Sequence, residues 1–124
     1  MPDDDVLPEG CKKSEFDDTS LTAVRNYVGN DYKVVYCDGL FPDTAKGINV
    51  PFSFVHLDAD IYQSTVAGIA FFYPLLQRGG RMVLDDYKFY RCPGVQKAVE
   101  EYFKDVKDVV LLSEELYSLT IIKL

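Results

Sequence analysis

The 124-residue sequence has a single histidine, three cysteines and no long apolar run. Its longest apolar stretches lie near residues 66–76 and are shorter than the roughly 20 residues that cross a bilayer. No cationic start precedes a signal-like core, so we expect neither membrane association nor secretion. The cysteines are odd in number, far apart and without metal-type spacing, which excludes a disulfide scaffold or a zinc knuckle. We therefore expect a cytoplasmic protein.

Basic residues are also scarce, with 13 Lys and Arg against 20 Asp and Glu and a net charge of −7. Because a negative surface repels a polyanionic backbone, nucleic acid is not an expected partner. A composition of 48 % hydrophobic and 27 % charged residues fits one globular domain of this length. We expect a loop or flexible arm over residues 1–18 and an α/β body over residues 19–124.

Helical and strand patterns alternate along the α/β body. Apolar periodicity predicts a helix starting at Thr19, with Thr19 or Asp18 as its cap, a second helix from Ser64 or Thr65 to about Arg78, and a third beginning near Pro93. Strand patterns cover residues 33–37, 52–60 and 80–87, and two further apolar runs follow in the tail.

These elements predict an open α/β sheet of about five strands. The strand over 52–60 begins as an almost continuous apolar run, which is typical of a strand covered on both faces. A helix joins it to the strand over 80–87, so these two strands are expected to be parallel. Glu114 and Glu115 separate the last two runs, which favours an antiparallel pair. We expect a mostly parallel sheet with helices on both faces.

Four aspartates follow the two central strands. Asp58 and Asp60 end the first strand, and Asp85 and Asp86 end the second, at the sheet edge where α/β proteins bind ligands. Two like charges about 4 Å apart repel by roughly 4 kcal/mol at an effective dielectric near 20, so a cation would stabilise such a group. Oxygen ligands favour Mg²⁺ first, then Mn²⁺ or Ca²⁺. Acids after strands also serve as helix caps and turn formers, which is the alternative interpretation.

Two families combine an apolar strand with a following Asp-x-Asp. FVHLDADI and MVLDD resemble the acidic stations of haloacid-dehalogenase-like phosphatases. However, Ile61 stands where that family has Thr or Val, and residues 61–80 contain no lysine that could hold a phosphate.

The second resemblance is closer. HLDADIYQST, LLQRGGRMVLDDY and CPGVQKAVEEYF, in this order, resemble the macrocin O-methyltransferase family of S-adenosylmethionine-dependent enzymes. The similarity extends more loosely upstream through DTSLTAV and GLFPDT, so it covers nearly the whole chain but only part of that family's fold.

The resemblance implies a Rossmann-like sheet and Mg²⁺-dependent methyl transfer from S-adenosylmethionine to a small-molecule hydroxyl, on a sugar or another natural product. It implies metal ligands at Asp58, Asp85 and Asp86 and a general base at Asp60. An ionised carboxylate there could take the proton of the acceptor hydroxyl.

The sequence supports a role in the site less strongly for His56, Tyr62 and Tyr87. His56 precedes Asp58 on the same strand face and could orient the cofactor, although a half-buried structural histidine is equally compatible. Tyr62 and Tyr87 could line the acceptor pocket, or could be packing groups. Nothing in the sequence near Cys92 lowers a thiol pKa, so a reactive thiol is not expected there.

The sequence lacks the glycine-rich turn that would bind the cofactor's amino-acid end in such enzymes. Its early glycines, Gly10, Gly29 and Gly39, are isolated, and no buried strand precedes Lys33. We therefore expect one partial methyltransferase domain over residues 1–124 that begins inside the fold. A sheet edge left open in this way favours homo-oligomers. A non-catalytic fragment that serves as an oligomerisation or binding module is the competing hypothesis.

Overall fold

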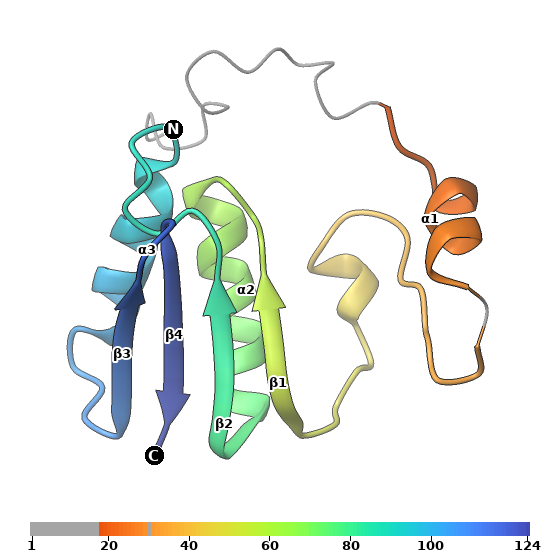
Figure 1. The fold of residues 1–124 in the computed structure, drawn as a ribbon. Helices are drawn as coiled ribbons and strands as arrows, with labels where there is room; N and C mark the ends of the chain where they lie inside the picture. Colours follow the sequence, from red (N-terminus) through yellow and green to blue (C-terminus); the bar gives the residue numbers. More distant parts are fainter. Residues whose placement is uncertain (1–17, 30) are drawn as a thin grey trace.

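The computed structural model describes residues 18–29 and 31–124. Its core is one mixed sheet with the strand order β1-β2-β4-β3 (Figure 1). The strands are β1 (Phe52–Leu57), β2 (Leu76–Leu84), β3 (Val109–Glu114) and β4 (Ser118–Lys123). The helices are α1 (Leu21–Val28), α2 (Tyr62–Leu75) and α3 (Pro93–Phe103), with a short 3-10 helix η2 at Asp43–Ala45.

The strand pairing confirms part of the predicted topology. β1 and β2 are parallel and are joined through α2, and β3 and β4 form the expected antiparallel pair. The sheet is not mostly parallel, however, because β4 returns beside β2 in the antiparallel direction. The expectation of about five strands was also wrong, since the described residues form four.

The helices that pack on the sheet cover one face of it. α2 and α3 pack against each other behind the sheet (Figure 1). Alternate residues of β2 and β4 face these helices and are buried, among them Met82, Leu84, Leu119 and Ile121. Together with residues of α3 they form the core. Helices on both faces were therefore predicted wrongly for the described part of the chain. For the same reason β1 is not covered on both faces, and Phe54 is 59 % exposed on the open side.

The segment over residues 33–37 is not a strand. It is β-branched and aromatic, but it forms no ladder with any described residue, and Val35 is 82 % exposed. β-propensity describes the fit to a pleated neighbour and cannot replace one. α1 precedes this segment and buries none of its residues. Its cap is Ser20, whose hydroxyl accepts a 3.1 Å hydrogen bond from the Ala23 amide, instead of the predicted Thr19 or Asp18.

α2 begins and ends earlier than predicted. It starts at Tyr62 after an extended Ile61, and Thr65 lies inside it, donating a 2.8 Å hydrogen bond from its hydroxyl to the Ile61 carbonyl. The helix ends at Leu75, and Leu76 is already extended, so the Gly79-Gly80 pair lies within β2. At the start of α2 the backbone approaches α3 closely, because a Cβ at Gly94 would lie 2.6 Å from the Tyr62 nitrogen. This close approach seats the start of α3 against the start of α2.

Candidate metal centre

The parallel pairing of β1 and β2 places Asp58 and Asp85 at the same edge of the sheet. Leu57 and Leu84 are the last residues in register, and the next residue of each strand is an aspartate. The Asp85 amide donates a 3.0 Å hydrogen bond to the Leu57 carbonyl, which extends the ladder by one step. Asp58 and Asp85 therefore leave the sheet side by side.

The other two aspartates reach the same place through an unusual backbone conformation. Asp60 and Asp86 both have left-handed backbones, with φ values of 58° and 59°. Few residues other than glycine adopt this conformation, and aspartate is among those that tolerate it. The side chain of Asp60 is within hydrogen-bonding reach of both Asp58 and Asp86. Left-handed turns after both strands thus turn the second acid of each pair toward the first.

The four carboxylates form two overlapping groups. One oxygen each from Asp58, Asp85 and Asp86 lie within 4.8 Å of one another, and Asp60 and Asp86 form a second group with the Cys92 sulfur under the same limit. The structure therefore brings together all four aspartates singled out in the sequence. Asp58 is exposed and the other three are half-buried, so a cation or an acceptor could reach the cluster from solvent.

Crowding and burial change the acidity of two of these groups. Partial burial raises the pKa of Asp58, the negative charges of Asp60 and Asp85 raise it further, and His56 opposes them. Burial, followed by a hydrogen bond that protonated Asp86 donates to Asp60 and then the charges of Asp85, Asp60 and Asp58, raises the pKa of Asp86 from 3.8 to about 6. Without a cation, the cluster therefore retains a proton more readily than ordinary surface carboxylates.

The donor set fits a hard divalent cation. Asp58, Asp85 and Asp86 offer oxygen only, and their separations of at most 4.8 Å are close to the roughly 3 to 4 Å between ligands of Mg²⁺. The nearby Cys92 sulfur is a soft ligand that Mg²⁺ does not prefer. The described residues fit the cofactor less well, since no strand among them is followed by a glycine-rich turn.

Cys92 lies beside the acid cluster, which the sequence did not predict. It is six residues from Asp86 in the sequence, and no spacing rule connects the two. In the structure its side chain is buried beside Asp60 and Asp86. The available signal was the position itself, a cysteine before Pro93 where a helix cap normally carries an oxygen.

The three residues with weaker claims lie in different surroundings. His56 is exposed on the open face of β1, near Asp58. Tyr62 points its hydroxyl to Glu101 on α3, 2.5 Å from the carboxylate oxygen, and so faces the helix layer. Tyr87 is a core residue, only 8 % exposed. Of the three, His56 lies nearest to the open side of the cluster, and the roles of all three stay predictions.

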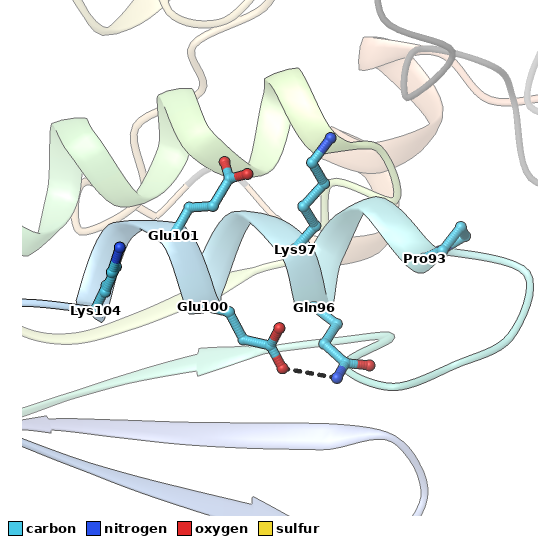
Figure 2. Close-up of a pocket in the computed structure, with 6 residues that line it drawn as sticks. All are labelled: Pro93, Gln96, Lys97, Glu100, Glu101 and Lys104. Atoms are coloured by element: carbon cyan, nitrogen blue, oxygen red, sulfur yellow. Dashed lines mark hydrogen bonds between the residues drawn. The ribbon is translucent and has the colours of Figure 1, made fainter.

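A hollow on α3 lies apart from the cluster. Glu101 and Lys97 line one side of it, and Gln96 donates a 2.8 Å hydrogen bond to Glu100 on the other (Figure 2). None of the four aspartates lines it, and its acidic and basic groups offset each other. We therefore place the candidate site at the carboxylates.

Comparisons with known proteins identify relatives of this chain. A family model described as Macrocin-O-methyltransferase (TylF) matches residues 16–115. A demethyldecarbamoylnovobiocin O-methyltransferase from Streptomyces niveus is 34 % identical over 79 residues, which are 63 % of this chain and 29 % of the relative.

A solved structure, that of the O-methyltransferase NovP, matches with a TM-score of 0.68 and 30 % identity over 80 % of this chain and 41 % of that chain. The chain thus spans less than half the length of these two relatives. Among the described residues, no helix has the length and apolar character to cross a membrane.

Proposed function

The chain belongs to the macrocin O-methyltransferase family, and on this premise we propose that it carries the metal-binding site and the general base of an enzyme that transfers a methyl group to a hydroxyl group. The acceptor is a sugar or another natural product, and the methyl donor is S-adenosylmethionine. The observation that supports this function is the convergence of the Asp58, Asp85 and Asp86 oxygens within 4.8 Å, with Asp60 beside them. Membership in a methyltransferase family decides against the phosphatase alternative.

The proposed roles follow from the chemistry of the carboxylates. Asp58, Asp85 and Asp86 hold Mg²⁺, which when bound supplies positive charge that acidifies the acceptor hydroxyl and keeps nearby carboxylates ionised. Asp60 accepts the hydroxyl proton as the acceptor oxygen bonds to the methyl carbon and the carbon–sulfur bond of the donor breaks. Asp60 suits this role because its carboxylate lies within hydrogen-bonding distance of the ligand set and is half-buried, which limits competing water.

The cofactor side of the reaction is assigned to no described residue. The described part of the chain contains no glycine-rich turn after a strand, and the chain spans 41 % of the NovP structure it matches. We therefore propose the activity for the chain together with the parts of the fold that its relatives add. The competing hypothesis, a binding module without catalysis, shares the fold and differs in predicting no cation binding.

The test is a methylation assay with matched variants. S-adenosylmethionine and the acceptor named for the relative, demethyldecarbamoylnovobiocin, are supplied to the chain and to a chimera that adds the parts of the relative the chain does not cover. We expect Mg²⁺-dependent methylation by the chimera, a loss of about 100-fold or more in Asp60→Asn, and no loss in the control Asp105→Asn, which lies on the exposed surface. Unchanged turnover in Asp60→Asn would refute its role as the base.

A further inference from the structure

Cys92 has no part in the roles assigned above, yet it lies against the acid cluster. Its Sγ atom and one carboxylate oxygen each from Asp60 and Asp86 lie within 4.8 Å of one another. The residue is only 4 % exposed, so its thiol faces protein groups and not bulk water. The thiol is therefore close to these two carboxylates on the buried side of the cluster.

The backbone fixes this contact. The Phe89 amide donates to the Asp86 carbonyl at 3.1 Å, and the Cys92 amide donates to the Phe89 carbonyl at 3.0 Å. Two successive turns thus return the chain to Asp86 before α3 begins. The Cys92 carbonyl then accepts from the Val95 amide at 3.2 Å, which ties the same residue to the first turn of the helix.

The position of Cys92 at the start of α3 is normally filled by an oxygen-bearing side chain. Ser, Thr, Asp and Asn cap helices through an oxygen that accepts an amide hydrogen, and losing such a cap costs about 1 kcal/mol. The Cys92 side chain makes no cap hydrogen bond with α3. Its sulfur lies within 4.8 Å of the acid oxygens instead, and α3 has no side-chain cap where a serine could supply one.

A thiol has suitable properties for this place. It is a weak hydrogen-bond donor without charge, so it can hold a carboxylate without adding to the repulsion or neutralising the cluster. It also competes poorly for Mg²⁺, which prefers oxygen. Building on the methyltransferase function proposed above, we propose that Cys92 is a positioning residue whose thiol holds the Asp60 and Asp86 carboxylates toward the cation and the acceptor.

Cation affinity tests this role without an activity assay. Mn²⁺ is titrated calorimetrically into the unsubstituted chain, Cys92→Ala, Cys92→Ser and the control Cys37→Ala, which removes an exposed thiol. We expect binding about 10-fold weaker in Cys92→Ala, because residues that hold a ligand typically contribute this much. Cys92→Ser keeps a donor and should stay within about threefold of the unsubstituted chain. Cys37→Ala should match the unsubstituted chain.

A thiol vibration gives a second readout that needs no change at Cys92. In the double variant Cys11→Ala, Cys37→Ala, Cys92 is the last thiol, and its S–H stretching band reports hydrogen bonding. We expect a band at lower frequency than a free thiol that shifts again when Mg²⁺ is added. A free-thiol band unmoved by Mg²⁺, or equal Mn²⁺ affinity in Cys92→Ala, would overturn the role of Cys92 alone. Absence of Mn²⁺ binding in the unsubstituted chain would overturn the proposed function itself.

Discussion

Replacing Asp86 with Asn should stabilise the cation-free protein at neutral pH. The fold raises the pKa of Asp86 from 3.8 to about 6, so the folded state binds this proton more tightly than the unfolded state. The stability that the proton contributes is present in full below about pH 3.8 and is lost as the pH rises through about 6. At neutral pH the folded protein therefore holds an ionised Asp86 at a cost, and asparagine removes that cost.

The size of the effect follows from the shift. About two pKa units correspond to roughly 3 kcal/mol, and solvent screening at this half-exposed site reduces the figure to about 1 to 2 kcal/mol. For a domain of this length, 1 kcal/mol moves the midpoint of thermal unfolding by about 4 °C. About two thirds of this effect falls between about pH 4.5 and pH 7.5, so without a cation the advantage of Asp86→Asn over the unsubstituted chain should grow by about 3 to 5 °C over that interval.

Circular dichroism melts in a chelator, at several pH values, measure this advantage. Asp105→Asn, which removes an exposed carboxylate outside the cluster, is the matched control and should show no such trend. Saturating Mg²⁺ should reverse the order of stability at pH 7.5, because the asparagine variant lacks one ligand. If the advantage of Asp86→Asn is the same at all pH values, or if the variant is less stable at pH 7.5 without a cation, the electrostatic account of the cluster is wrong.

Two further predictions concern the fold. Gly94→Ala places a Cβ against the backbone of Tyr62 and should lower the free energy of unfolding, measured by urea denaturation, by about 1 to 3 kcal/mol. The control Gln63→Ala, on the exposed side of α2, should change it little, and equal stabilities of the two variants would contradict the close packing of α2 and α3. Phe54 lies on the open face of the uncharged edge strand β1, and Phe54→Lys should shift any oligomer toward monomer because a lysine on an edge strand blocks pairing with a second copy. Sedimentation velocity measures this shift, and an unchanged distribution would show that β1 is not the contact between copies.

Much of the site could be predicted from the sequence because its geometry depends on a local rule. Parallel neighbouring strands end at one edge, so Asp58 and Asp85, each directly after an apolar strand, had to lie together once β1 and β2 were paired. The hydrogen bond from the Asp85 amide to Leu57 carries that register one residue past the strands. By contrast, the sequence pattern does not predict the left-handed backbones of Asp60 and Asp86, although these bring the second acid of each pair into the cluster.

The errors have a common physical cause, which is that local patterns do not specify neighbours. Residues 33–37 have strand-like composition, but no described segment pairs with them. The apolar run of β1 predicted cover on both faces, yet Phe54 is exposed because α2 and α3 lie on a single side. The proximity of Cys92 to the acids was not predicted either, because it depends on the two turns that follow Asp86.

Binding of Mg²⁺ to the chain tests the account most directly, because every proposed role depends on the cluster holding a cation. Calorimetric titration at about pH 7.5, where Asp86 is ionised, should show one Mg²⁺ per chain. Asp58→Asn and Asp85→Asn should each weaken the affinity by about 10-fold or more, with Asp43→Asn, at an exposed pair with Lys46, as the control. No measurable binding, or affinities in the Asp58 and Asp85 variants equal to that of the unsubstituted chain, would contradict the account.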